Sequence, residues 1–290
     1  MHRRDLLAGL AAFSASPLLT GLLPDAGLAQ AATTPLKKNF VFWECMRWEK
    51  GPSSLASCGL RRMPIYYQNS LLTNGEMDPQ KVAKVVAQIK ANKQTMVTLD
   101  VELWNPASIP QREKYIRLIE YVRARVPSST KLSLYGILPR PRYHDYVAGG
   151  IRLKQRQNEN RIAAPIAAKC DWIMPMFHTY QPNRVHWAKF AKVIIAEARQ
   201  YKKPVMPWLW PQYHERTSPA ALRHTLLPGD FFREQLETAY QLADSLCIWG
   251  TRTDALTGIK ASRATWNPKS PWWTQTKAFL RSKNGPVCKL

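Results

Sequence analysis

Short apolar runs alternate with amphipathic segments along most of the chain. The apolar runs contain many β-branched and aromatic residues, as buried strands do, and they begin at Asn39, Met63, Gln94, Lys131, Asp171, Lys203 and Asp244. The segments between them repeat apolar side chains at three- and four-residue intervals, which predicts helices over residues 79–91, 112–126, 185–201 and 231–243. Because strands that alternate with helices form parallel sheets, we expect a parallel α/β fold.

The length of the chain narrows this fold class. The chain has 290 residues, of which 45% are hydrophobic, and this is enough for one large core. About seven or eight strand–helix units would use nearly all of residues 32–290, and that number favours a closed barrel over an open doubly wound sheet. We therefore predict an α/β fold, a TIM-like (β/α)7-8 barrel in a single domain.

The first part of the chain, residues 1–31, has the pattern of an export signal. Arg3 and Arg4 precede a short apolar segment, and the small residues of "AQA" at positions 29–31 suit a cleavage site. This pattern predicts twin-arginine export, a mature protein that begins near Ala32, and a periplasmic or secreted location without stable membrane insertion. An uncleaved membrane anchor is the alternative, because an apolar run of about 17 residues is the lower limit of a membrane span.

The five cysteines suit the oxidising compartment that an export signal implies. Cys170 and Cys247 lie beside or within apolar runs, which predicts buried thiols. Cys45 with Cys58, or one of these two with Cys288, is the expected disulfide, and the spacing leaves the pairing open. The cysteines do not have the paired spacing of metal ligands.

The charge balance indicates the class of partner. The chain has 42 Lys and Arg against 20 Asp and Glu, a formal net charge of +22, and such a charge attracts polyanions over long range. For an exported protein this favours an anionic polysaccharide, a cell-wall polymer or an anionic lipid surface over nucleic acid, with simple solubility as the alternative. Guanidinium groups also pair well with uronic acid carboxylates. Arginines follow the predicted strands at Arg47, Arg140, Arg142, Arg184, Arg216 and Arg252; a solvated basic surface is the alternative.

The ends of the predicted strands are aromatic and polar. Parallel barrels carry their active sites where the strands run into the following loops. A pyranose ring has an apolar CH face and a rim of hydroxyls, so a cleft of aromatic rings and hydrogen-bonding groups suits a sugar. The candidate substrate-binding residues at these ends are Trp43, Glu44, Tyr67, Asn69, Trp104, Tyr135, His178, Tyr180, Trp208, Trp210 and Trp249.

The stretch "TMVTLDVELWNP" (residues 95–106) places two carboxylates at one strand end. Asp100 and Glu102 share a face of the strand, while Val101 points back toward the helices. Two adjacent carboxylates cannot both ionise easily, so one pKa rises, and we expect Glu102 to be the protonated general acid.

The spacing of these two carboxylates also indicates a mechanism. Ordinary glycosidases flank the scissile bond with carboxylates on opposite sides, which adjacent positions on one strand do not obviously do. A substrate-assisted hydrolysis fits better: Asp100 would orient the substrate's acetamido group, and Glu102 would act as acid and then base. The alternative is a structural pair that caps loops or meets arginines.

Neither a metal nor a nucleotide cofactor is expected. The six histidines are scattered and none lies in a ligand pattern such as HExxH. With 13 glycines, the chain has no GxGxxG motif and no phosphate-binding loop.

Five short motifs, in this order, resemble the hyaluronidase family of barrel glycosidases. They are "FVFWECMRW", "PIYYQNSL", "LDVELWNP", "LSLYGILPRPRYHDY" and "SLCIWGT". "DVELWNP" and "CIWGT" are the more specific ones. The resemblance spans roughly residues 38–252, which is nearly the whole predicted mature chain.

The resemblance implies a distorted (β/α) barrel and hydrolysis of a β-linked, N-acetylhexosamine-containing polymer with retention of configuration. By position, Asp100 would match the residue that holds the acetamido group, Glu102 the proton donor, and Trp249 a wall of the subsite. Tyr143 and Tyr180 are the nearest counterparts of the family's site tyrosines. In "MPMFHTYQ" a histidine occupies the expected tyrosine position.

Together these features predict an exported glycoside hydrolase that acts on an amino-sugar polysaccharide, and the charge balance favours an anionic one. Two alternatives stay open. A polysaccharide lyase on a uronate polymer would need a base, and His178 with Tyr180 would supply one. A non-catalytic barrel that binds polysaccharide would need the same aromatic cleft and basic residues but no reaction.

Overall fold

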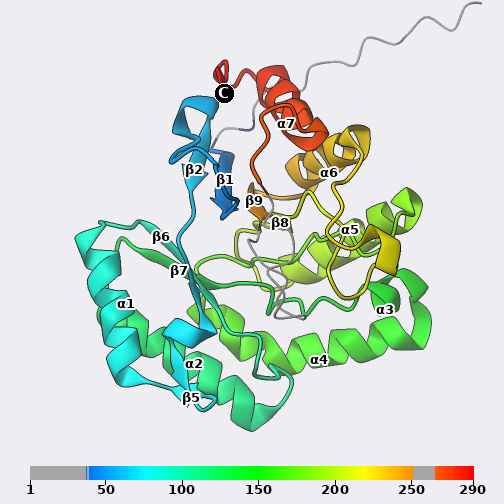
Figure 1. Ribbon diagram of the computed structural model, residues 1–290. Coiled ribbons are helices and arrows are strands. Elements are labelled where there is room, and N and C mark those ends of the chain that lie inside the picture. The colour runs from blue at the N-terminus through cyan, green and yellow to red at the C-terminus, as the bar shows by residue number, and fades with distance from the viewer. Residues whose placement is uncertain (1–36, 38, 251–264) are drawn as a thin grey trace, which may run out of the picture. The chain divides into compact units, whose positions relative to one another are not determined.

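The computed structural model describes residues 37, 39–250 and 265–290. The predicted export signal and Arg252 lie outside these residues. The described part is a mixed α/β structure in which nearly all strand pairings are parallel (Figure 1). This confirms the expected α/β class with parallel sheets.

The strands form two parallel sheets and one small antiparallel hairpin. One sheet has the order β2-β1-β9-β8 and the other the order β3-β6-β7, and β4 pairs with β5 in the hairpin. The strands are β1 (Val41–Met46), β2 (Leu60–Arg62), β3 (Ile65–Tyr67), β4 (Leu72–Thr73), β5 (Glu76–Met77), β6 (Met96–Asp100), β7 (Lys131–Leu134), β8 (Trp208–Leu209) and β9 (Ser245–Gly250).

Further backbone contacts connect the two parallel sheets. The Met63 amide donates to the carbonyl of Glu44 at 2.8 Å, and the Thr98 amide donates to the carbonyl of Pro64 at 3.0 Å. The continuous segment 60–67 therefore pairs with β1 through β2 and with β6 through β3. On the other side, isolated parallel bridges join Tyr135 to Met174, Ile173 to Val205 and Met176 to Trp208.

These bridges are all that the structure shows of the strand predicted from Asp171. Pro175 has no amide hydrogen to give to a ladder, so a continuous strand cannot form there. The chain still runs parallel to β8, because the Trp208 amide donates to the Pro175 carbonyl at 2.9 Å.

The helices lie between the strands in sequence, and α1, α2, α5 and α6 confirm the four predicted helices. Helix α2 packs against α4, and α6 packs against α7, as Figure 1 shows. The α-helices are α1 (Pro79–Ala91), α2 (Ile109–Arg123), α3 (Tyr143–Ala148), α4 (Gly150–Lys169), α5 (Arg184–Arg199), α6 (Gly229–Leu242) and α7 (Pro271–Ser282), with short 3-10 turns η1 (Ala56–Cys58), η2 (Gln68–Ser70) and η3 (Ala220–Leu222).

Local sequence signals explain where two of these helices begin. Asp78 accepts hydrogen bonds from the amides of Gln80 and Lys81 before α1, and Pro79 follows it at the first helical position. Asn183 accepts from the His186 amide before α5. Each cap satisfies amide groups that the first helical turn leaves unpaired.

The buried side chains form two groups. The larger group fills the space between the strands and the surrounding helices, and its largest fully buried members include Trp187, Phe190 and Trp272. The smaller group consists of side chains from the strand segments themselves: Trp43, Cys45, Met63, Met96, Tyr135, Met174, Met206, Trp208 and Cys247. Tyr135 belongs to this group and also reaches the site described below.

One of the expected disulfides is present. Cys58 pairs with Cys288, and Cys45, Cys170 and Cys247 are free and buried. The bridge ties the segment after β1 to the C-terminal end of the chain, and the buried state of Cys170 and Cys247 confirms the prediction. None of the described helices combines the length and the apolar character that a membrane crossing needs.

Candidate active site

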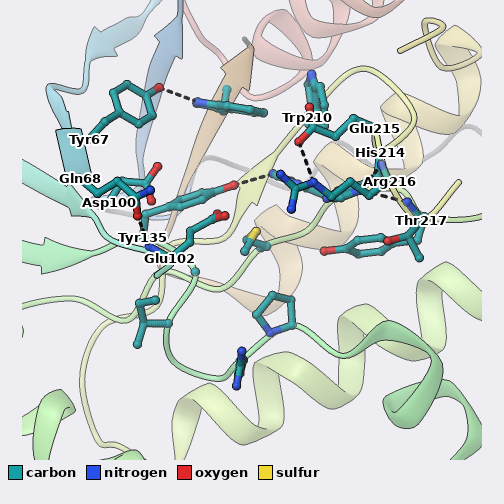
Figure 2. Close-up of a pocket in the computed structure, with 18 of the residues that line it drawn as sticks. Tyr67, Gln68, Asp100, Glu102, Tyr135, Trp210, His214, Glu215, Arg216 and Thr217 are labelled. Carbon is teal, nitrogen blue, oxygen red and sulfur yellow. Dashed lines mark hydrogen bonds and ion pairs between the residues drawn. The ribbon is translucent and has the colours of Figure 1, made fainter. Parts of the chain in front are cut away.

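A cavity of about 910 Å³ opens where the strands run into their following loops. Figure 2 shows that side chains from well-separated segments converge on it. Ten of the predicted site residues line it: Tyr67, Asn69, Asp100, Glu102, Trp104, Tyr135, His178, Tyr180, Trp210 and Trp249. The strand-end rule therefore identified a real convergence of polar and aromatic groups.

Contacts from neighbouring elements hold the loop that carries Glu102. The Tyr115 hydroxyl, on α2, lies 2.7 Å from the carbonyl of Val101 and 2.8 Å from that of Trp104, and donates to them. The Trp104 indole N–H donates to the Gly75 carbonyl of the β4–β5 turn at 2.8 Å, and its ring packs edge-on against Tyr115. Val101 is fully buried. Glu102 is thus an accessible carboxylate on a loop with buried anchors.

Asp100 and Glu102 differ in their surroundings. Asp100 is 8% exposed, and burial, followed by the charge of Glu102, raises its pKa well above the ordinary value. Glu102 keeps an exposed surface, but the cavity walls exclude part of its water, and this partial desolvation raises its pKa, with Arg216 opposing the rise and Glu215 adding to it. The sequence predicted that pairing would protonate Glu102; in the structure burial is the larger cause, and it favours the proton on both groups, with Asp100 the more enclosed.

Tyr135 and His178 form a buried hydrogen-bonded pair in the cavity wall. The Tyr135 hydroxyl lies 3.0 Å from His178 Nε2, and burial lowers the pKa of His178 well below its usual value, so the imidazole is neutral. The His178 ring stacks on Trp249, with ring centroids 5.5 Å apart, and Trp249 meets Trp210 edge-on at 4.9 Å. This pair and the two indoles make one continuous aromatic wall.

The opposite side of Trp249 meets Tyr67. The Trp249 indole N–H lies 3.4 Å from the Tyr67 hydroxyl, and the Arg47 guanidinium lies over the Tyr67 ring at 4.8 Å. Burial raises the pKa of Tyr67 to about 12, so its hydroxyl stays protonated at neutral pH. Tyr67 therefore offers the cavity a hydroxyl and an aromatic face rather than a charge.

Four predicted site residues lie outside the cavity lining: Trp43, Glu44, Tyr143 and Trp208. Trp43 and Trp208 belong to the smaller buried group, which is formed by side chains of the strand segments. Tyr143 is buried behind Tyr180, with ring centroids 5.3 Å apart. Trp208 packs on Tyr135, and Tyr143 packs on Tyr180, so both support lining residues instead of lining the cavity themselves.

Glu44 has a structural partner. It is 2% exposed, accepts a hydrogen bond from the Met46 amide at 3.0 Å and forms an ion pair with Arg62 at 2.9 Å. Side chains alternate along a strand, and Glu44 shares the face of Phe42 and Met46, which pack on the helix side. This alternation directs Glu44 away from the cavity.

The predicted arginines divide in the same way. Arg47, Arg140, Arg142 and Arg216 line the cavity. Arg184 instead pairs with Asp230 at 2.7 Å on the protein surface. Of the four lining arginines, Arg140 is half-buried and donates to Asn105 at 2.8 Å.

Several lining residues were not found from the sequence. Gln68 accepts from the Glu102 amide at 3.3 Å. His214, Glu215 and Thr217 belong to the loop that follows β8. Burial lowers the pKa of His214 to about 4, so this histidine is neutral. The signal that could have found this loop is the polar run "QYHERT" directly after a predicted strand.

Glu215 is the third carboxylate of the cavity. Its side chain is 16% exposed, and its nearest ion-pair contact is the Arg216 Nε at 3.7 Å. In Figure 2, Glu215 and Arg216 lie on the other side of the cavity from Asp100 and Glu102. Over the described residues, no group of three or more His, Cys, Asp or Glu side chains is arranged to hold a metal ion.

No protein-family model matches the chain, and no curated protein matches it by sequence. Among solved structures, bee venom hyaluronidase in complex with a hyaluronic acid tetramer matches with a TM-score of 0.54 and 13% identity, over 86% of this chain and 98% of that one. An endo-β-1,3-glucanase of family GH128 from Amycolatopsis mediterranei, in complex with laminaritriose, matches with a TM-score of 0.46 and 10% identity, over 83% of this chain and 100% of that one. In its fold, the chain is similar to a barrel glycoside hydrolase.

Proposed function

We propose that the protein is a glycoside hydrolase that cleaves an N-acetylhexosamine-containing, anionic polysaccharide by a retaining, substrate-assisted mechanism. The observation that carries the proposal is the pair Asp100 and Glu102, with raised pKa values, at the side of a large aromatic cavity. The fold similarity to a hyaluronidase supports it.

In the first step Glu102 gives its proton to the glycosidic oxygen while the substrate's acetamido oxygen attacks the anomeric carbon. The C–O bond to the leaving sugar breaks, and a cyclic intermediate forms within the substrate. Glu102, now a carboxylate, takes a proton from water, and this water opens the intermediate with overall retention of configuration. The raised pKa of Glu102 suits the acid role at near-neutral pH.

Asp100 would hold the acetamido group during this sequence. In the free protein, burial and the nearby Glu102 favour its protonated form. When the acetamido N–H lies against Asp100, Asp100 releases its proton to the solvent, because a hydrogen bond to the carboxylate favours the charged form. This charge supports the positive charge that develops on the amide. Asp100 therefore becomes negatively charged when the substrate binds.

The cavity walls suit the remaining surface of a sugar chain. Trp249, Trp210 and Tyr67 offer ring faces for the CH side of pyranoses, while the hydroxyl of Tyr180 and the amides of Gln68 and Asn69 suit the rim of sugar hydroxyls. Burial keeps the pKa of Tyr180 above its usual value, so this group is a neutral hydrogen-bonding partner.

The charges of the lining favour an anionic polymer. Four arginines line the cavity, against three carboxyl groups of which two have raised pKa values. The forks of Arg140, Arg142 and Arg216 could meet carboxylates on alternate sugars of a chain. The formal net charge of +22 would attract the same polymer over long range.

The strand pairings support a closed barrel as the scaffold. The sequence of contacts runs from β1 to segment 60–67, then to β6, β7, segment 173–176, β8 and β9, and returns to β1. We infer that these segments form one closed (β/α) barrel of seven strands, with the cavity at its carboxyl end. Export by a twin-arginine signal would deliver this domain, residues 32–290, to the periplasm or the medium.

The lyase alternative is less well supported. A lyase needs a base near neutral pH, and burial raises the pKa of Tyr135, Tyr67 and Tyr180, so these tyrosines keep their protons. The neutral His178 already uses Nε2 in its contact with Tyr135. A binding protein without activity would share the aromatic cavity, so the presence or absence of cleavage separates it from a hydrolase.

The test compares the mature protein with Glu102→Gln on a panel of acetamido-sugar and uronic acid polysaccharides. We expect new reducing ends from the wild type and a loss of about 100-fold or more in the variant, because general acid catalysis contributes roughly that much. Glu234→Gln, on α6 and outside the cavity, is the matched control and should retain activity. Binding without cleavage by the wild type would indicate the non-catalytic alternative.

A further inference from the structure

Glu215 has an unusual position for a carboxylate that serves only the fold. It follows β8, whereas Glu102 follows β6, and these strands belong to different sheets. Figure 2 shows Glu215 and Glu102 on different sides of the same cavity. Both side chains line that cavity, so both face a sugar chain that is bound there.

The carboxylate of Glu215 also lacks the hydrogen bonds that would satisfy it. Its side chain is 16% exposed, yet within residues 39–250 and 265–290 it accepts no hydrogen bond, and Arg216 Nε, at 3.7 Å, is too distant for one. A largely enclosed carboxylate needs donors, and here these must come from water or from a ligand. The Arg216 guanidinium supplies a nearby opposite charge without occupying the oxygens.

This placement differs from that of Asp100. Asp100 and Glu102 come from one segment and approach a substrate from one side, which serves a reaction where the substrate provides its own nucleophile. A substrate without an acetamido group needs a second carboxylate on the other face of the anomeric carbon. Within the cavity lining, Glu215 is the carboxylate on the side opposite Glu102.

We propose that Glu215 is a further catalytic residue, the base for an additional activity: hydrolysis of β-linked glycans that lack an acetamido group. A water molecule held by Glu215 attacks the anomeric carbon and gives its proton to Glu215. The bond to the leaving sugar breaks, and Glu102 gives its proton to the leaving oxygen. The products contain one water more than the substrate, and the configuration is inverted.

This inference rests on the proposed function in one respect, because Glu102 is the acid in both reactions. The two routes differ in stereochemistry. A substrate with an acetamido group is attacked at the anomeric carbon twice, first by its own acetamido oxygen and then by water, so its configuration is retained. A substrate without that group is attacked at the anomeric carbon once, by water, so its configuration is inverted.

The test uses β-linked gluco-oligosaccharides and an activated aryl β-glycoside of glucose, with the products followed by NMR. We expect the wild type to release the inverted anomer first. Glu215→Ala should lose about 100-fold or more of this activity, and should lose much less on acetamido polymers, where it only removes a charge that raises the pKa of Glu102. Azide should restore turnover of the aryl glycoside by Glu215→Ala, because azide attacks carbon without losing a proton, and the product should be the inverted glycosyl azide.

The controls separate the possible failures. Glu234→Ala removes a carboxylate outside the cavity and should behave as the wild type without azide and form no glycosyl azide. No hydrolysis of acetamido-free glycans, a retained product anomer, or a Glu215→Ala variant that stays inactive with azide would each overturn the role of Glu215. Failure of the proposed function would look different: the wild type would cleave no acetamido polymer, or Glu102→Gln would cleave it as fast as the wild type.

Discussion

The loop that carries Glu102 depends on one buried hydroxyl, and this dependence can be measured. Tyr115 is fully buried on α2, and its hydroxyl serves the carbonyls of Val101 and Trp104, on either side of Glu102, at 2.7 and 2.8 Å. Tyr115→Phe removes the hydroxyl and keeps the ring that packs on Trp104 at 5.1 Å. The change therefore tests the hydrogen bonds and leaves the packing in place.

The expected loss of stability follows from the contacts. One hydroxyl proton is shared by two carbonyls, so one donor is lost, and at least one buried acceptor is left without a partner. Such a loss costs about 1–3 kcal/mol, which corresponds to a fall in Tm of roughly 2–12 °C for a domain of this size. Activity should fall as well, because a displacement of about 1 Å at a catalytic group costs about 100-fold in rate.

The assay measures thermal unfolding together with kcat and KM on the substrate that the panel identifies. We expect kcat to fall by about tenfold to 100-fold, with a smaller change in KM, since the loop positions the acid rather than the sugar. Tyr121→Phe, on the same helix and outside the cavity lining, is the control and should leave both quantities nearly unchanged. A Tyr115→Phe variant with lowered Tm and unaltered kcat would refute the positioning role.

Three further predictions follow from single contacts. Burial holds the pKa of Asp100 above its ordinary value of 3.8, so the folded state binds its proton more tightly than the unfolded chain, and stability falls as pH rises from 3.8 through the folded-state pKa. Asp100→Asn should therefore be inactive on acetamido polymers yet raise the Tm at neutral pH, and a gain that persists below pH 3.8 would contradict this. Arg216 lowers the pKa of Glu102, whereas burial and Glu215 raise it, and Asp100 lies beside it. Arg216→Ala removes the lowering charge, so the alkaline limb of kcat/KM should move to higher pH. A shift to lower pH would count against Glu102 as the acid. The Cys58–Cys288 bridge closes a separation of 230 residues, so Cys58→Ser should cost at most about 5.5 kcal/mol by the chain-entropy relation, measured by calorimetry, and an unchanged Tm would show that the bridge adds no stability.

The regular part of the fold could be predicted because its pattern is local. Helices α1, α2, α5 and α6 carry apolar stripes that bury one face, and the periodicity identified them. Helix α4 has no such stripe, since "KQRQNENR" is polar on every side and Pro165 lies within it. Its position is set by contacts with α2 and α3, which no local pattern records.

The site could be predicted only as far as strand ends define it. Asp100 and Glu102 were found because they follow a strongly apolar strand. Trp43 and Trp208 are equally aromatic but lie one layer deeper, and sequence does not give the depth of a side chain along a strand. Glu215 was missed because it lies several residues beyond the end of β8, and only the path of the following loop brings it to the cavity.

The most direct test of the proposed hydrolysis follows the oxygen atom that water adds to each product. The wild type and Glu102→Gln would be incubated with the acetamido polymer in ¹⁸O-water, and the products would be analysed by mass. Hydrolysis by the proposed mechanism places one ¹⁸O at each new reducing end in the wild type and leaves Glu102→Gln almost without product. Unlabelled, unsaturated products would identify a lyase, and labelled products formed equally well by Glu102→Gln would contradict the role of Glu102.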